Sequence, residues 1–247
     1  MLLFFIEGLL LWCWQAMFFY LIFRGISDLN TMTLQQLKHD VAKGEGLFIE
    51  FKLKLPEWDK LMREVVAFAN TEGGTVYIGV DDDGRLVGER DPREVEEVLP
   101  GKIEAYCRPV PDFRLSRIPI SPKRAVVAIR VRRSLCKPLL VLPEPNAAKG
   151  LAVIRIKDSS VTASREMFAL LKYEGRERDM KVEFGDKERV LMQFLEEKGQ
   201  VTVAEFALVA KIGKQVASRT LVHLVKANVL RIVPGVDQRD RFLRLHS

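Results

Sequence analysis

The sequence predicts an α+β domain followed by a smaller, mainly helical domain that ends in a β-hairpin. Apolar residues recur with a period of two between residues 47 and 53, as in a strand, and with helical spacing between residues 56 and 69. Segments of both kinds continue to residue 172, whereas helical spacing dominates after residue 186. With 247 residues and 48% hydrophobic composition, the chain is long enough for two cores and unlike a disordered or fibrous protein.

Each predicted element of the first domain has a local signal. Thr33 and Gln36 form a capping box at the start of a helix, and Pro56 opens the next helix. Three aspartates and a glycine at 81–84 predict a hairpin turn, and prolines between residues 109 and 122 mark loops. These signals place helices at 33–42, 56–69, 92–99, 102–107 and 164–171, and strands at 47–53, 75–80, 85–87, 114–118, 126–132 and 152–156, the last two completing the sheet.

The second domain has the pattern of three helices and a hairpin. A polar, charged linker at 173–185 precedes it, and Thr202 with Glu205 forms a capping box for its second helix. A tight turn separates the second helix from the third, and two strands then bracket a wing. The pattern predicts a winged helix-turn-helix over residues 186–247, with helices at 186–198, 202–210 and 215–227 and strands at 229–233 and 242–245.

Residues 1–31 stand apart from both domains. Met1 to Phe23 is almost continuously apolar, with Glu7 as its only charge, and as a helix it would reach about 35 Å, enough to span a bilayer. The segment is either a transmembrane helix or an extension foreign to the folded unit, since Met32 stands directly before the recognisable domain. No basic region precedes it and no small-residue cleavage site follows, which argues against a cleaved signal peptide. The expected location is the cytoplasm, or the inner membrane with both domains facing the cytoplasm.

Charge is distributed unevenly along the chain. The net charge of +6 and the pI near 9.2 favour an acidic partner, either nucleic acid or anionic lipid. Residues 113–137 carry eight basic side chains and no acidic one, whereas residues 81–97 have a net charge of −5, so a basic face beside an acidic patch is expected. The three cysteines and three histidines show no metal-ligand spacing, which argues against a zinc site, a disulfide framework and a histidine-based active site.

One strand carries charged residues suited to phosphate chemistry. Glu50 and Lys52 lie two positions apart and therefore project from the same face of the strand at 47–53. Metal-dependent nucleases use carboxylates to hold Mg²⁺ or Mn²⁺ and a lysine to orient water or stabilise phosphate. Glu45 and either Asp81 or Asp82 are candidates for further oxygen ligands. The alternative is a solvated ion pair on an exposed face beside an ordinary turn.

Three segments in fixed order carry a family resemblance. They are Gly44-Glu45 through Glu50-Phe51-Lys52, Ala67 through Gly74, and Ile78 through Gly84. Together they resemble the Schlafen-type AlbA domain, found in prokaryotic regulators with a C-terminal helix-turn-helix and in the nucleic-acid-cleaving core of the Schlafen proteins. The resemblance covers about residues 33–164 and implies a mixed sheet with flanking helices over residues 32–172. In the ribonuclease branch it implies an acidic triad, which here would be Glu45, Glu50 and Asp81 or Asp82, with Lys52 contacting phosphate.

The resemblance also gives a weak nucleotide prediction. Proteins of this type are often labelled ATP-binding, and backbone N–H groups at Asn70, Thr71, Gly73 and Gly74 could face a phosphate. The alternative is a helix C-cap and tight turn. The sequence has neither a P-loop nor a strand-linked Gly-x-Gly-x-x-Gly, so ATP as a cofactor lacks support from a nucleotide motif.

Two groups of basic residues are candidate nucleic-acid contacts. One follows the strand at 126–132 and the loop before it, and its alternative is a solvated edge strand. The other lies on the exposed face of the third helix and on the wing, within residues 199–247, which have a net charge of +5; its alternative is a winged helix used for protein contacts. The candidates are Arg130, Arg132, Arg133, Lys123 and Arg124 in the first group and Lys214, Gln215, Ser218, Arg219, Arg239 and Arg241 in the second.

Taken together, the patterns predict a nucleic-acid-binding protein. The first interpretation is a DNA-binding transcriptional regulator that forms a homo-oligomer, since helix-turn-helix proteins commonly pair on two half-sites. The second is a metal-dependent endoribonuclease that acts on structured RNA with Mg²⁺ or Mn²⁺. A tether to the membrane through residues 1–23 is compatible with either.

Overall fold

The computed structural model describes residues 32–145, 147–174 and 184–245. The predicted membrane segment at 1–23 and most of the predicted linker at 173–185 lie outside these ranges. None of the helices within the described ranges has the length and apolar character needed to cross a membrane. The described residues between 32 and 174 are called the N-terminal unit below, and residues 184–245 the C-terminal unit.

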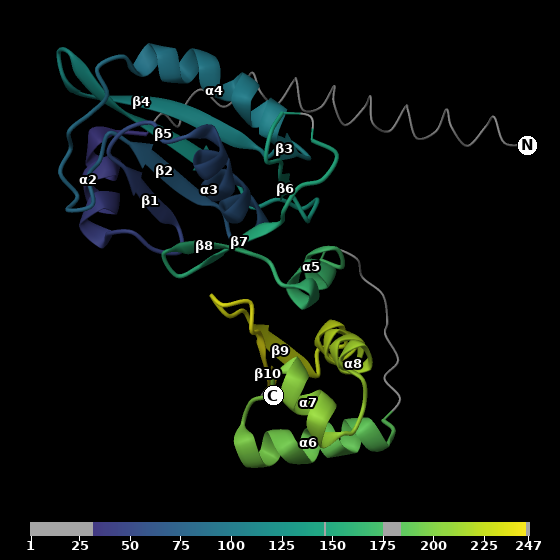
Figure 1. Ribbon diagram of the computed structural model, residues 1–247. Helices are drawn as coiled ribbons and strands as arrows, with labels where there is room; N and C mark the ends of the chain where they lie inside the picture. Colours follow the sequence, from purple (N-terminus) through teal and green to yellow (C-terminus); the bar gives the residue numbers. More distant parts are fainter. Residues whose placement is uncertain (1–31, 146, 175–183, 246–247) are drawn as a thin grey trace, which may run out of the picture.

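A four-stranded mixed sheet forms the centre of the N-terminal unit (Figure 1). Its order is β1-β2-β5-β4, in which β1 and β2 are parallel and the other neighbours antiparallel. A parallel pair needs a crossover connection, and the helix α3 provides it. These elements span Ile49–Lys52 (β1), Trp58–Asn70 (α3), Gly74–Ile78 (β2), Phe113–Ser121 (β4) and Arg124–Val131 (β5).

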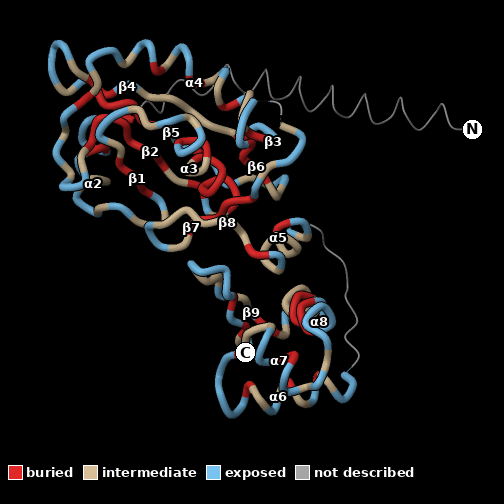
Figure 2. The backbone as a smooth tube through the Cα atoms, viewed as in Figure 1, coloured by how far each residue is buried: buried red, intermediate tan, exposed pale blue. Residues whose placement is uncertain are grey.

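Helices cover both faces of this sheet, which confirms the predicted α+β class. On one face, α3 and α4 (Pro92–Tyr106) pack against Val76 and Ile78 of β2. On the other face, α2 (Leu34–Lys43) packs in the core that contains Tyr77. Figure 2 shows the buried positions following β2 and α3. Because side chains alternate along a strand, the residues of β1 also divide between the two faces.

Two short strand pairs and a helix complete the N-terminal unit. β3 (Cys107–Arg108) pairs with β6 (Leu140–Val141), and β7 (Val153–Ile156) pairs with β8 (Ser159–Thr162), both antiparallel. β7 packs against α3, with Val153 in the core on that side of the sheet. The helix α5 (Arg165–Leu171) follows, with Ser164 as its N-cap, close to the predicted helix at 164–171.

The structure corrects three predictions for the N-terminal unit. The helices predicted at 92–99 and 102–107 are the single helix α4, which continues through Pro100 because Leu99 and Ile103 hold it in the core. Residues 85–87 contribute only an isolated bridge between Val80 and Leu86. Residues 152–156 form β7 as expected, but β7 pairs with β8 outside the central sheet.

The C-terminal unit has three helices and an antiparallel hairpin. Thr202 and Glu205 form the predicted capping box at the start of the second helix. Leu191, Leu221 and Phe242 are fully buried in a core shared by the helices and the hairpin. The elements are α6 (Asp186–Lys198), α7 (Val203–Val209), α8 (Lys214–Lys226), β9 (Leu230–Val233) and β10 (Arg241–Arg244).

The helix α5 connects the two units (Figure 1). Leu171 packs in a cluster with Ala152 and Ile154 around β7, which ties α5 to the N-terminal unit. On its other side, the Ser218 hydroxyl of α8 donates a hydrogen bond to Glu166. The Ser164 hydroxyl donates to Asp240, next to β10. The hydrogen bonds therefore link α5 both to α8 and to the hairpin.

Candidate functional site

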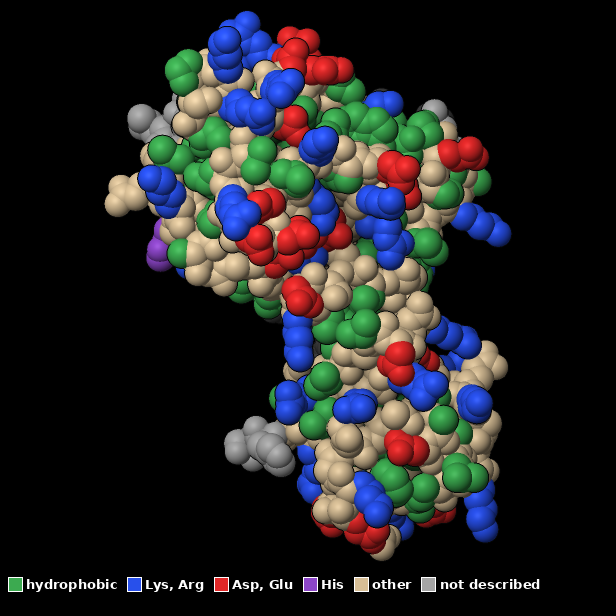
Figure 3. All heavy atoms as spheres, turned by 60° about the vertical axis from the view of Figure 1, so that its left-hand side comes forward, with side chains coloured by type: hydrophobic (Ala, Val, Ile, Leu, Met, Phe, Trp, Pro, Cys, Tyr) green, Lys and Arg blue, Asp and Glu red, His purple; other side chains and the backbone are tan. Residues whose placement is uncertain are grey.

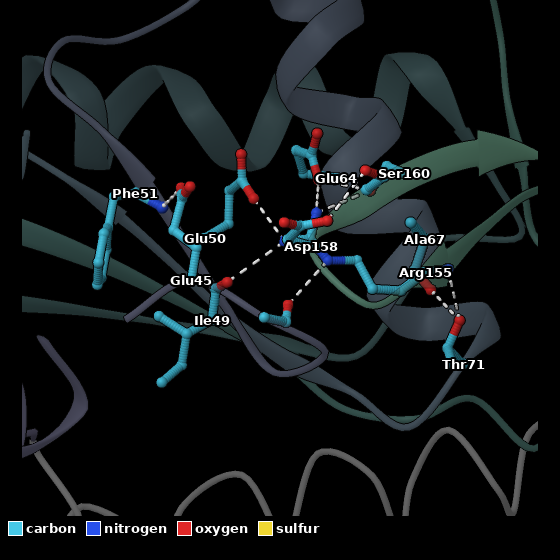
Figure 4. A network of polar contacts seen from close by, with 12 residues as sticks. Glu45, Ile49, Glu50, Phe51, Glu64, Ala67, Thr71, Arg155, Asp158 and Ser160 are labelled. Atoms are coloured by element: carbon cyan, nitrogen blue, oxygen red, sulfur yellow. Dashed lines mark hydrogen bonds and ion pairs between the residues drawn. The ribbon is translucent and has the colours of Figure 1, made fainter. Parts of the chain in front are cut away.

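Arg155 of β7 is the centre of a buried polar network (Figure 4). Its Nη2 atom donates to Glu50 Oε2 at 2.6 Å, and its Nη1 atom donates to Glu64 Oε2 at 2.7 Å. Glu50 is only 6% exposed, and its other oxygen pairs with Lys52. The network thus joins β1, α3 and β7, which are distant in sequence.

Backbone groups and an aromatic ring fix the Arg155 side chain. Its Nε atom donates to the Gly46 carbonyl at 3.1 Å, and Nη2 also donates to the Ile49 carbonyl at 3.3 Å. The guanidinium lies over the Phe68 ring, 5.0 Å from the ring centre. Such a contact between a cation and an aromatic face is favourable, and more so away from water. Arg155 therefore has one well-defined position.

Glu64 is the second carboxylate of the network. The Ser160 hydroxyl of β8 donates to Glu64 Oε2 at 2.5 Å. Burial raises the pKa of the Glu64 carboxyl above its ordinary value, and the nearby Glu50 carboxylate raises it further. Arg155, Lys52 and Ser160 oppose that increase because they stabilise the charged form. Two carboxylates and two cations thus share one desolvated region.

The predicted acidic triad is brought together only in part. The exposed Glu45 accepts a hydrogen bond from the Phe51 N–H at 2.8 Å, so it lies beside β1, as Figure 4 shows. Asp81 accepts from the Arg85 N–H at 2.7 Å within its turn, and Asp82 is exposed. Within the described ranges, no three His, Cys, Asp or Glu side chains gather as metal ligands. The ligand roles of Glu45, Glu50 and Asp81 or Asp82 therefore stay a prediction.

The ion pair between Glu50 and Lys52 that was stated as the alternative is present, but Glu50 is buried and does not lie on an exposed face. Both oxygens of Glu50 already have cationic partners, Lys52 on one side and Arg155 on the other. Arg155 and Glu64 were not identified from the sequence. A local signal existed for Arg155, a lone charge within the apolar strand Val-Ile-Arg-Ile, but nothing local indicated which carboxylates it contacts.

Asn70, the first residue of the candidate phosphate-binding segment at 70–74, has a structural role. The Asn70 amide nitrogen donates to the carbonyls of Leu139 and Val153, both at 2.9 Å, and its oxygen accepts from the Leu139 N–H. Asn70 is only 2% exposed, so its side chain holds neighbouring segments together and is not free for a nucleotide. The Thr71 hydroxyl donates to Ala67 and accepts from the Arg155 N–H.

Gly73 and Gly74 instead line a cavity of about 480 Å³ together with basic residues of the first predicted group. Arg130 and Arg132 are exposed on one face of the chain at the end of β5, as predicted, while Ile129 and Val131 are buried. Acidic partners reduce the available charge: Arg132 pairs with Asp112 at 3.2 Å, and Arg133 pairs with Glu72 at 3.0 Å. Asp40, Lys43 and Glu72 also line this cavity.

The other two residues of that group lie apart from this cavity. Arg124 donates to the carbonyls of Val87 and Gly88, the latter at 2.9 Å, and so holds the segment after the aspartate turn. Lys123 is exposed in the turn between β4 and β5.

On the face of the molecule shown in Figure 3, acidic side chains gather on the lower part of the larger unit, with lysines and arginines around them.

Most of the second predicted group lies on the surface of the C-terminal unit. Lys214, Gln215 and Arg219 of α8 are exposed, and so are Arg239 and Arg241 at the hairpin. Arg239 pairs with Asp237 at 3.4 Å. In contrast, Ser218 is 7% exposed because α5 covers this part of α8, so the prediction that it lies on an exposed face is wrong.

Comparison with known proteins gives a family match for the sheet-containing part of the chain. Residues 45–164 match the model of the family described as Schlafen, AlbA_2. The match supports an AlbA_2 domain in this part of the N-terminal unit, as the sequence resemblance implied. A search of curated proteins found no match.

Two solved structures show weaker likeness. The DIP2311 protein from Corynebacterium diphtheriae is 18% identical, with a TM-score of 0.39; the match covers 80% of this chain and 34% of that protein. This chain thus spans about a third of that protein's length. The N-terminal domain of an ATP-dependent DNA helicase RecG-related protein from Nitrosomonas europaea is 26% identical, with a TM-score of 0.36, and the match covers 50% of this chain and 88% of that domain.

Proposed function

We propose that the protein binds duplex DNA as a transcriptional regulator, and that the C-terminal unit is the winged helix-turn-helix that reads the DNA. The observation that carries this proposal is the exposure of polar and basic residues of α8 and the hairpin, of which Lys214, Gln215 and Arg239 line one cavity. The exposed residues are Lys214, Gln215 and Arg219 of α8 and Arg239 and Arg241 at the hairpin. The AlbA_2 match is in keeping with a role at nucleic acid.

The arrangement suits the physical requirements of DNA recognition. An α-helix fits the major groove, where side chains such as Gln and Arg bond to base edges. Gln215 and Arg219 lie within the first two turns of α8, the part of a recognition helix that normally contacts bases, and Lys214 adds a positive charge at its first residue. Arg239 and Arg241 would contact phosphates on the flanking backbone. We also propose a homo-oligomer on paired half-sites, which light scattering of the DNA complex would measure.

Replacing Arg219 with Gln tests the proposal. The change removes one cation but retains a side chain that forms hydrogen bonds. We expect weaker binding of a genomic duplex fragment and, if Arg219 contacts phosphate, a salt dependence less steep by about 0.9 log units per log of salt. Fluorescence anisotropy over a salt series measures both. Arg93→Gln, an exposed change on α4, is the control, and equal behaviour of the two variants would contradict the proposal for Arg219.

A metal-dependent endoribonuclease is the second candidate. The observation that favours it is the position of the exposed Glu45 beside Glu50 and Lys52 at β1. This candidate is less well supported because Glu50 is already held by Arg155 and Lys52. ATP binding at the cavity beside Gly73 and Gly74 likewise stays a prediction.

A further inference from the structure

A second cavity, of about 350 Å³, lies where α5 meets the C-terminal unit. Three separate segments each contribute one exposed cation to it. Arg165 comes from the first turn of α5, Lys214 from the first turn of α8, and Arg239 from the loop between β9 and β10. Arg165 belongs to the N-terminal unit, so the cavity is composite.

The acidic residues of this cavity already have donors within the protein. Glu166 accepts a hydrogen bond from the Ser218 hydroxyl. Asp240 accepts from the Ser164 hydroxyl and from the Gly235 N–H, the latter at 3.2 Å, and burial raises the pKa of Asp240. These hydrogen bonds also link α5 to α8 and the hairpin, so they set the relative positions of the segments that carry the three cations.

The cations, in contrast, have little internal compensation. Among the described residues, neither Arg165 nor Lys214 makes an ion pair, and Arg239 pairs only with Asp237 at 3.4 Å, an exposed contact of little strength. The first turn of α8 also has no side-chain cap, which adds partial positive charge on the side of Lys214. The result is a hollow lined by three cations from three segments, beside two carboxylates that are engaged by serine hydroxyl groups.

We propose that this cavity binds a phosphate group, and that on duplex DNA it holds one backbone phosphate between the two units. Arginine presents a planar set of N–H donors that matches phosphate oxygens, and lysine adds a point charge. The inference rests on the proposed DNA-binding function and deepens it. It makes Arg165, in α5 of the N-terminal unit, a part of the nucleic-acid interface, and it gives the hydrogen bonds of Ser164 and Ser218 a positioning role.

The test is the salt dependence of duplex binding by the full chain and its Arg165→Gln variant. A mixed-sequence duplex is the probe, because a phosphate contact does not depend on base sequence. We expect Arg165→Gln to bind more weakly and to lose about 0.9 from the slope of log affinity against log salt. Arg165→Lys keeps the charge and is expected to retain the slope. Arg93→Gln removes an exposed charge from α4, which lies on the opposite side of the N-terminal unit from α5 and α8 in Figure 1, and is expected to change neither quantity.

Failure of this inference can be told from failure of the proposed function. If the full chain binds the duplex but Arg165→Gln retains its slope, the phosphate site is wrong while DNA binding stands. If the full chain does not bind the duplex, the proposed function is wrong and inorganic phosphate becomes the probe. A rise in thermal unfolding temperature with phosphate that Arg165→Gln loses would then support the cavity as a site for a small phosphate, and no rise would overturn it.

Discussion

Arg155 shows how one side chain can join three elements. It lies in β7, and its two terminal nitrogens hold Glu50 of β1 and Glu64 of α3. Its side chain is fully buried, so each charge in the network depends on its partners for compensation. The removal of a single member is therefore expected to cost more than an average surface contact.

We predict that Arg155→Met lowers the free energy of unfolding by about 3–5 kcal/mol, because it removes the arginine from Glu64 and leaves Glu50 with Lys52 as its remaining cationic partner in a desolvated site. Urea unfolding measures the loss. The exposed control Arg93→Met is expected to change stability by less than about 0.5 kcal/mol. In a double-mutant cycle, Glu64→Gln should cost less in the Arg155→Met background than in the wild type. Strictly additive losses would show that Arg155 and Glu64 do not interact.

Glu64 gives a prediction for pH. Its pKa is raised in the folded state by burial and by Glu50, so the folded protein holds this proton at pH values where the unfolded chain has released it. The resulting stabilisation is complete below the ordinary value of 4.5 and is lost as the pH rises through the folded pKa. Relative to Glu64→Gln, the wild type should therefore gain stability as the pH falls from neutral toward 4.5. Urea midpoints at several pH values measure this, and an unchanged difference would contradict it.

At the scale of elements, the turn between α3 and β2 leads the chain from the helix into the sheet and passes close to the end of β5. Gly73 adopts a φ of +79°, and a Cβ there would lie 2.9 Å from the Arg133 nitrogen and the Val131 oxygen. Both atoms belong to the backbone at the end of β5, so they cannot rotate away. Glycine at this position permits both the left-handed conformation and the close approach of β5.

Gly73→Ala is therefore predicted to destabilise the protein more than Gly199→Ala. Both positions have similar φ values, +79° and +75°, so both should cost about 1–2 kcal/mol for the left-handed conformation. A Cβ at Gly199, however, has no neighbour within 4 Å, so only Gly73→Ala must also displace backbone. Thermal unfolding of the two variants measures the difference. Equal losses would show that the turn at Gly73 relaxes freely.

At the scale of the whole molecule, the two units have separate cores and meet through α5. The buried network of Arg155 lies in the N-terminal unit, whereas the exposed cations of α8 and the hairpin lie in the C-terminal unit. The two candidate functions therefore use different surfaces, and a single set of variants separates them.

We predict that EDTA does not weaken duplex binding, because the proposed DNA contacts involve no metal. We also predict that RNA incubated with Mn²⁺ stays intact, because Glu50 is already held by Arg155 and Lys52. Glu45→Gln is expected to leave duplex affinity unchanged. Glu45 is exposed and Gln keeps its acceptor for the Phe51 N–H, so this variant tests the carboxylate without disturbing the buried network. Electrophoresis of tRNA and retention of duplex fragments provide the readouts. Discrete RNA cleavage that requires both Mn²⁺ and Glu45 would favour the nuclease instead.

The sequence alone determined the helices and strands whose signals lie within a few neighbouring residues. Capping boxes at Thr33 and Thr202 and the alternation in β1 predicted helices and a strand that the structure contains, because these signals act within a few residues. Three ordered motifs indicated a Schlafen-type AlbA domain over about residues 33–164, and residues 45–164 match the model of that family. Pro100 misled the prediction, since core packing of α4 outweighed its local preference to break a helix.

Only the tertiary structure decided which charges meet. Glu50, Glu64 and Arg155 are separated by up to 105 residues, and nothing local to any of them names its partners. In the same way, Ser218 follows the helical pattern of an exposed position, and only the docking of α5 buries it. The spacing of apolar residues along a helix or strand predicts which of its side chains face the core. Contacts between distant segments depend instead on how whole elements pack.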